Sequence, residues 1–353
     1  MNNYIRKDIQ QLKAYHLNSY PEAIKLNQNE IPYDLPAELK AKILEKLVRN
    51  PWNRYPLPQP YALRDKLSQS LAWPSEGILL SNGSNVLIQA LILATSVNSR
   101  VLTLDPTFSL YEIEAKVLGN EVELVALGEN FSFPTQAILD SIQKNPPSLI
   151  FIANPNAPTG NLFPKSEIIK VLQAAPCLVV VDEAYFQFAD ENFIPELSQY
   201  PNLVLLRTFS KAMGLGGVRL GYALAAPELI QEVSKVLLPY CVSGVTEAIA
   251  QTVLEHPELV EKRVMEIKIE RAKIFQSLSS MDKVKVYPSQ TNFLIFQVGD
   301  SQTVFEALLR EKVLLRDVSH PVSLPNTLRV SVGTPEENDK FINALQRVMK
   351  ALF

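Results

Sequence analysis

One stretch decides the fold: "NLVLLRTFSKAMGLGGVRLGY", which runs from Asn202 to Tyr222. Its continuous apolar run is typical of a strand buried on both faces of a parallel sheet. Lys211 follows this run, and a glycine-rich turn then leads to Arg219. A lysine at the end of a buried strand is either an ordinary solvated side chain or a nucleophilic amine. The other strands must distinguish these two interpretations.

Comparable apolar runs occur upstream and alternate with segments of helical spacing. The runs are "ILL", "VLTL", "VELV", "LIFIA" and "LVVV", and they end near residues 80, 104, 125, 153 and 181. Strands that alternate with helices form an α/β fold, and uninterrupted apolar strands are covered on both faces. The sequence therefore predicts a mostly parallel sheet with helices on both faces.

The pattern changes after about Leu238. A long charged helix, a strand pair in "VKVYPSQTNFLIFQV" and a final helix follow there. A chain of 353 residues is expected to form about two domains. We expect a large domain over residues 41–240 and a smaller α+β domain over residues 241–353. An N-terminal arm over residues 1–40 is expected to pack with the smaller domain.

Composition and missing motifs exclude several classes of function. The net charge is −3 and no long basic block occurs, which argues against nucleic-acid binding. The start has no signal-peptide pattern and no run reaches the ~18 apolar residues of a membrane span, so a cytoplasmic protein is expected. HExxH, CxxC and GxSxG are all missing, which argues against a metal site and against a serine hydrolase.

Polar side chains follow five of the predicted strands. Because ligands bind at the carboxyl ends of the strands in such sheets, these side chains should meet in one crevice. The groups are Ser84 and Asn85, Asp105, Asn154 and Asn156, Asp182 and Tyr185, and Ser210 and Lys211. Their predicted convergence is stronger support for a site than any single motif.

The types of these residues favour one cofactor. Ser84 and Asn85 open a predicted helix, where they either cap it or help to bind a phosphate. Asp182 is predicted to be buried, and a buried carboxylate needs a partner unless it only caps a turn. The glycine-rich turn does not complete the dinucleotide-binding motif G-x-G-x-x-G, because Arg219 occupies the position of the third glycine. We therefore expect Arg219 to bind a phosphate and do not expect a dinucleotide site. A lysine amine, a buried acid and a phosphate site together match pyridoxal phosphate.

The ordered motifs resemble those of the fold-type-I pyridoxal-phosphate aminotransferases, within which the chain looks like the histidinol-phosphate aminotransferases. The resemblance covers nearly the whole chain and implies a sheet of the seven-stranded type and a homodimer with shared active sites. The motifs are "KLNQNE", "RYPLPQP", "SNGSN", "DPTFSLY", "NPNAPTG", "VDEAY", "TFSKAMGLGGVRLGY", "LLRDVS" and "LRVSVGT".

The resemblance also implies roles for single residues. Lys211 would carry the cofactor and move the proton, Asp182 would pair with the pyridinium nitrogen, and Tyr185 would bind the ring's 3-oxygen. Phe108 would stack on the ring. The cofactor phosphate would be bound by Ser84, Asn85, Thr208, Ser210 and Arg219, and by Tyr55 of the other subunit. The substrate would be bound by Arg316, Arg329, Tyr20, Asn29 and Glu30.

Two positions depart from the family pattern. Ala157 stands where the family usually has an asparagine that contacts the ring's 3-oxygen, so we expect Asn156 or Asn154 to replace it. Asn85 stands where an aspartate is common, a change that backbone binding of phosphate tolerates.

The expected reaction is amino transfer between L-histidinol phosphate and 2-oxoglutarate. An aromatic aminotransferase and a threonine-phosphate decarboxylase are alternatives on the same fold. A regulatory protein with a retired aminotransferase domain is disfavoured, because the chain has no basic helix for DNA and keeps Lys211 and Asp182. Arg316 could also simply pair with Asp317 at the surface.

Overall fold

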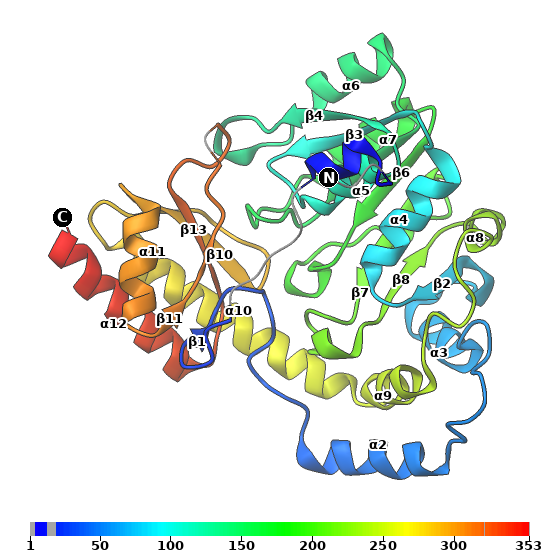
Figure 1. The fold of residues 1–353 in the computed structure, drawn as a ribbon, viewed down its shortest axis with the longest axis horizontal. Coiled ribbons are helices and arrows are strands. Elements are labelled where there is room, and N and C mark those ends of the chain that lie inside the picture. The colour runs from blue at the N-terminus through cyan, green and yellow to red at the C-terminus, as the bar shows by residue number, and fades with distance from the viewer. Residues whose placement is uncertain (1–3, 13–18, 321, 353) are drawn as a thin grey trace.

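A seven-stranded sheet forms the centre of the larger part of the protein (Figure 1). The computed structural model, which describes residues 4–12, 19–320 and 322–352, gives the strand order β2-β8-β7-β6-β5-β3-β4. Of these seven strands β8 alone runs in the opposite direction to the other six, which confirms the predicted mostly parallel sheet. The strands are β2 (Ile78–Ser81), β3 (Arg100–Asp105), β4 (Glu121–Ala126), β5 (Leu149–Ala153), β6 (Leu178–Asp182), β7 (Leu203–Thr208) and β8 (Gly221–Leu224).

Both faces of this sheet are buried under helices, as predicted. Because successive strand residues point to opposite faces, Ile150 and Ile152 belong to one apolar cluster while Leu149 and Phe151 belong to another. The second cluster is covered by α4 (Ser84–Thr95), α5 (Leu110–Val117) and α8 (Pro227–Ser234). The first is covered by α3 (Tyr61–Leu71), α6 (Thr135–Lys144), α7 (Lys165–Ala174) and α9 (Gly244–Leu254).

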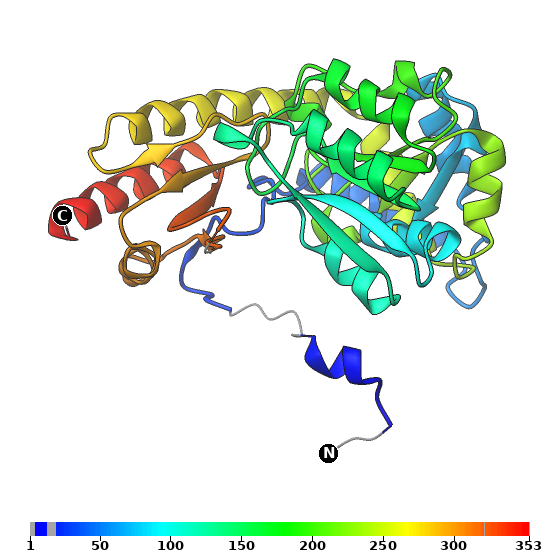
Figure 2. The same ribbon diagram turned by 90° about the horizontal axis from the view of Figure 1, so that it is seen from above.

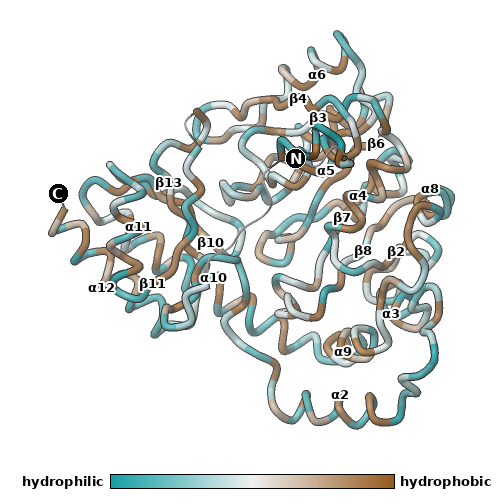
Figure 3. Tube along the Cα trace, in the orientation of Figure 1, coloured by the Kyte–Doolittle hydropathy of each residue, from teal (hydrophilic) through white to brown (hydrophobic). Residues whose placement is uncertain are grey.

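A second, antiparallel sheet forms the smaller part of the protein, with the order β12-β13-β10-β9. The strand pair predicted over residues 284–298 is confirmed as β9 (Lys285–Val286) and β10 (Phe293–Gln297), and β12 (Arg316–Asp317) and β13 (Thr327–Ser331) complete the sheet. Its helices are α10 (Pro257–Ser279), α11 (Ser301–Arg310) and α12 (Pro335–Leu352). α12 alternates between hydrophobic and hydrophilic residues (Figure 3), and its apolar side is buried against α10 and α11.

The N-terminal segment touches both parts of the molecule. β1 (Ile24–Lys25) pairs in parallel with β11 (Val313–Leu314) in the smaller part, whereas α2 (Ala37–Arg49) packs on α9. The helix α1 (Lys7–Gln11) stands apart from both (Figure 2). Residues 1–3 and 13–18 of the predicted arm lie outside the described residues. The domain boundaries at residues 40 and 240 stay a prediction.

Short 3-10 helices connect several of these elements: η1 (Ser75–Gly77), η2 (Glu129–Phe131), η3 (Phe186–Phe188), η4 (Ile194–Glu196) and η5 (Gly216–Val218). Within residues 4–12, 19–320 and 322–352, the structure contains no helix of the length and apolarity that a membrane span requires.

Candidate active site

A cavity of about 200 Å³ lies at the carboxyl ends of the strands of the larger sheet. Side chains from the ends of several strands therefore converge on one cavity, as the sequence predicts. Most of the predicted cofactor residues line it. These are Ser84, Asn85, Phe108, Asp182, Tyr185, Thr208, Ser210, Lys211 and Arg219. Its wall also contains Tyr111, Ala153, Pro155, Ala157 and Ala184, which sequence reasoning did not assign to the site.

One end of the cavity is suited to an anion. The backbone at Gly83 has φ +82°, and a Cβ atom there would lie 2.6 Å from the Arg219 guanidinium. A Cβ atom on Gly221 would lie 2.3 Å from the backbone nitrogen of Ser84 at the start of α4. These two glycines thus allow the guanidinium and the positive end of the helix to approach one another. Arg219 Nη1 also lies 3.4 Å from Ser210 Oγ.

The wall of the cavity also contains a buried acid. Asp182, which is 5% exposed, accepts hydrogen bonds from Tyr111 Oη at 2.7 Å and from the Ala184 N–H at 3.0 Å. Burial raises the pKa of Asp182 to about 6, although both hydrogen bonds act in the opposite direction. A cationic or proton-donating group bound against this carboxylate would relieve the cost of its burial.

Tyr111 is the main residue that sequence reasoning missed. Its ring stacks on Phe151 at 4.8 Å, and burial raises its pKa well above the ordinary value, so the phenol stays a donor to Asp182. The signal was present in the sequence, because Tyr111 follows Phe108 by three residues, about one helical turn. The two rings meet edge to face in the structure, with centroids 5.5 Å apart.

A buried ion pair supports the strand ends that carry the acid and the lysine. Arg207 on β7 and Glu183 after β6 are each about 1% exposed, and their charged atoms lie 2.7 Å apart. The Arg207 guanidinium also lies 3.7 Å from the ring centroid of Phe186. Breaking one partner of such a pair would leave an uncompensated buried charge. The pair therefore links the end of β6, which carries Asp182, to β7, which leads to Lys211.

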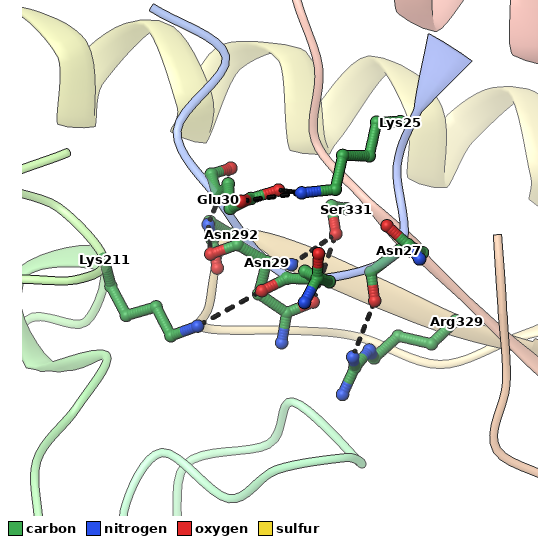
Figure 4. A network of polar contacts seen from close by, with 9 residues as sticks. Lys25, Asn27, Asn29, Glu30, Lys211, Asn292, Arg329 and Ser331 are labelled. Carbon is green, nitrogen blue, oxygen red and sulfur yellow. Dashed lines mark hydrogen bonds and ion pairs between the residues drawn. The ribbon is translucent and has the colours of Figure 1, made fainter. Parts of the chain in front are cut away.

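Lys211 and Tyr185 stand in the middle of the site. The Lys211 ammonium donates a hydrogen bond to the Gln28 carbonyl at 3.2 Å and lies 5.6 Å from the centre of the Tyr185 ring. Figure 4 shows this lysine pointing toward the segment that carries Asn29. The Tyr185 hydroxyl accepts a hydrogen bond from Asn29 Nδ2 at 2.9 Å.

A second cavity, of about 560 Å³, adjoins the first and shares four of its residues: Phe108, Ala157, Tyr185 and Lys211. Arg316 and Arg329 both line it, and they are direct partners across β12 and β13. Arg329 Nη2 donates to the Asn27 carbonyl at 3.1 Å. Asp317, the alternative partner of Arg316, accepts the N–H of Ser319 at 2.8 Å instead. The two arginines give this cavity a pair of neighbouring cations, and the carboxylates of Asp105, Glu112 and Asp317 also line it.

Four predicted site residues lie outside the walls of both cavities. Glu30 is exposed and forms an ion pair with Lys25 at 2.6 Å, and Tyr20 is half-buried elsewhere. Tyr55 is 84% exposed and stacks on Tyr240 at 5.0 Å.

The fourth is Asn156, for which the structure corrects the prediction. Its fully buried amide donates to the Pro106 carbonyl at 2.9 Å and to Thr159 Oγ1 at 2.7 Å, so it does not face the cofactor cavity. The other amide considered, Asn154, accepts the Phe163 N–H at 2.8 Å.

Comparison with known proteins agrees with this geometry. The family model for aminotransferase class I and II matches residues 21–345. The histidinol-phosphate aminotransferase of Deinococcus radiodurans is 36% identical over 344 residues, which cover 97% of this chain and 95% of that protein. The enzyme of the same name from Gloeobacter violaceus is 40% identical over 349 residues, with 97% and 96% covered. The crystal structure of histidinol-phosphate aminotransferase from Sinorhizobium meliloti in complex with pyridoxal-5'-phosphate has the same fold, with a TM-score of 0.90 over 100% of this chain and 99% of that one at 23% identity.

Proposed function

Because the chain belongs to the class I and II aminotransferases, we propose that it transfers the amino group of L-histidinol phosphate to 2-oxoglutarate, giving imidazole acetol phosphate and glutamate in histidine biosynthesis. One observation carries this proposal. The cavity that contains Lys211 and Asp182 shares part of its wall, including Lys211 itself, with the cavity that contains Arg316 and Arg329.

Pyridoxal phosphate is the cofactor of this family, and the residues of the smaller cavity fit it. Arg219, Ser210 and the start of α4 at Ser84 would hold its phosphate, and Asp182 would hold its ring nitrogen. When bound, the cofactor withdraws electrons from the substrate carbon and so makes the proton on that carbon removable.

The chain's own groups then bind and move the proton. The Lys211 amine would take the proton from the substrate carbon and then deliver it to the cofactor carbon, which is general base and general acid work. Asp182 keeps a proton on the ring nitrogen, because a carboxylate buried without a partner is costly. Phe108 limits the movement of the ring, and the Tyr185 hydroxyl binds its 3-oxygen.

The substrate phosphate is bound by Arg316 and Arg329. A phosphate monoester carries up to two charges, and the planar fork of arginine binds such groups through paired charge-assisted hydrogen bonds. Both guanidinium groups line the same cavity, as their pairing across β12 and β13 requires.

A substrate panel on the purified protein tests this function. Glutamate formation should be far more efficient with histidinol phosphate than with histidinol or with aromatic amino acids. Threonine phosphate, offered in parallel, should release no carbon dioxide. Equal efficiency with histidinol and its phosphate would argue for a general aromatic aminotransferase, and release of carbon dioxide would argue for the decarboxylase.

We also propose a homodimer in which Tyr55 completes the active site of the partner. The support is an exposed apolar surface around this loop, formed by Trp52, Tyr55, Leu57, Leu238 and Tyr240. Mixing Tyr55→Phe chains with Lys211→Ala chains should restore one intact site in each hybrid dimer. Activity no higher than that of the separate variants would contradict the shared site. The predicted cytoplasmic location remains a proposal that cell fractionation can test.

A further inference from the structure

Two consecutive residues of the N-terminal segment touch both reactive side chains of the site. The Gln28 carbonyl accepts the hydrogen bond of Lys211 Nζ at 3.2 Å, and Asn29 Nδ2 donates to Tyr185 Oη at 2.9 Å. Gln28 and Asn29 themselves line the larger cavity together with Lys211 and Tyr185. This segment is therefore part of the wall where the two cavities join.

The smaller sheet fixes the orientation of Asn29 (Figure 4). The Asn29 N–H donates to Ser331 Oγ at 2.8 Å, and Ser331 Oγ donates to Asn29 Oδ1 at 3.1 Å. Asn292 Nδ2 donates to the Asn29 carbonyl at 2.9 Å. Asn29 is 2% exposed and has φ 56°, a left-handed conformation that asparagine tolerates better than most residues. In this network Ser331 Oγ donates to Oδ1, and Nδ2 faces Tyr185.

This direction of the hydrogen bond decides what the Tyr185 hydroxyl can do. Because its oxygen accepts from an amide, its single proton stays available for another acceptor. Tyr185 is 7% exposed and lines the cofactor cavity, so a group bound in that cavity can accept its proton. Asn154 and Asn156 do not supply the donor to Tyr185 in place of Asn29, because the side chains of both are bound to other partners.

We propose that Asn29 is a positioning residue that directs the Tyr185 hydroxyl proton into the cofactor cavity. The hydrogen bond that Tyr185 donates there would then depend on the position of the smaller sheet. The inference rests on the proposed function, since it takes the acceptor to be the 3-oxygen of pyridoxal phosphate. The link to that sheet is made by two hydrogen bonds, from the Asn29 N–H to Ser331 at the end of β13 and from Asn292, just before β10, to the Asn29 carbonyl.

The test is an absorbance titration of the protein loaded with pyridoxal phosphate. A donor to the 3-oxygen favours its anionic form, which dominates at high pH. Asn29→Gly removes the amide and suits φ 56°, so the midpoint of the titration should rise by roughly 0.3–1 pH unit, the size of one modest hydrogen bond. In a Tyr185→Phe background the same substitution should add nothing, because its effect passes through the hydroxyl.

Two further variants keep the result interpretable. Asn29→Asp retains the size of the side chain but offers an acceptor, so it should raise the midpoint at least as far even if the glycine variant fails to fold. Asn338→Ala is the matched control in the smaller part. It removes a buried amide that donates to the Gly333 carbonyl at 3.0 Å, and it should lower the melting temperature without moving the midpoint.

The outcomes separate the inference from the proposed function. If the unmodified protein gains no visible band with pyridoxal phosphate, the proposed function fails and this inference fails with it. If the band forms but the Asn29 variants leave the midpoint unchanged, the inference alone is overturned. A shift of equal size in the Tyr185→Phe background or in the Asn338→Ala control would overturn it as well.

Discussion

The two cavities of the site are built in different ways. The smaller one is walled mainly by strand ends of a single sheet, and its acid and lysine come from the adjacent strands β6 and β7. The larger one combines the N-terminal segment, the end of β3 and the strands β12 and β13, which are far apart in the chain. Under the proposed function, the smaller cavity would carry the reaction chemistry and the larger one would select the substrate. Changes in the first cavity should slow all substrates alike, whereas changes in the second should alter the preference among them.

The largest effect should come from Lys211, which belongs to both cavities. Lys211→Ala removes the amine that we propose moves the proton, so turnover should fall by roughly 10²–10⁴-fold or more for every substrate. The visible band of the lysine-bound cofactor should disappear. Lys235→Ala removes an exposed lysine paired with Glu232 and serves as the control, with turnover unchanged. Full turnover in Lys211→Ala would sink the assignment.

Asp182 should give the next largest effect, and it should not discriminate among substrates. Asp182→Asn removes the charge that we propose pairs with the ring nitrogen, so turnover should fall by roughly 10²-fold with both histidinol phosphate and histidinol. If turnover fell with only one of these two substrates, the proposed separation of reaction and substrate choice between the cavities would be contradicted.

The same substitution has a defined effect on the stability of the cofactor-free protein. Burial raises the pKa of Asp182 from 3.8 to about 6, so this group's contribution to folding is largest below pH 3.8 and is lost as the pH rises through 6. Asp182→Asn should therefore gain stability over the parent between about pH 4 and 7, by up to about 3 kcal/mol. Denaturant unfolding at several pH values measures this. A difference independent of pH would contradict the raised pKa.

The contrast between the cavities also explains what the sequence could predict. Residues at strand ends were found because an apolar run and the polar residue after it are neighbours in the chain, as for Asp182. Tyr111 was missed because its bond to Asp182 joins residues 71 positions apart. Asn156 was expected to replace the ring contact because it is the neighbour of Ala157 in the chain, but its amide donates to the Pro106 carbonyl and to Thr159 Oγ1. The amide that reaches Tyr185 is that of Asn29, 156 positions away in the chain.

Arg316 tests the second cavity by itself. Arg316→Ala removes one of the two guanidinium groups, so the efficiency with histidinol phosphate should fall roughly tenfold or more. The efficiency with histidinol should change little, which narrows the gap between the two substrates. Arg310→Ala, at the end of α11 and outside both cavities, is the control. Equal slowing of both substrates would mean that Arg316 acts on the reaction rather than on the phosphate.

Tyr111 should give the smallest effect and the sharpest comparison. Its hydroxyl donates to Asp182 at 2.7 Å, it lines the first cavity, and it is outside the wall of the second. Tyr111→Phe removes a bond that lowers the pKa of Asp182, so that pKa should rise above about 6 and the pH-dependent loss of stability should move to higher pH. Turnover should fall only several-fold, because one hydrogen bond is lost while the carboxylate remains.

The ratio of efficiencies with histidinol phosphate and histidinol should stay constant in Tyr111→Phe, unlike in Arg316→Ala. Tyr200→Phe, whose hydroxyl is bound by Gln173 outside both cavities, should change none of these quantities. A changed substrate ratio in Tyr111→Phe would show that the hydrogen bond from Tyr111 to Asp182 also affects substrate binding in the second cavity. The proposed separation of reaction and substrate choice between the two cavities would then be wrong.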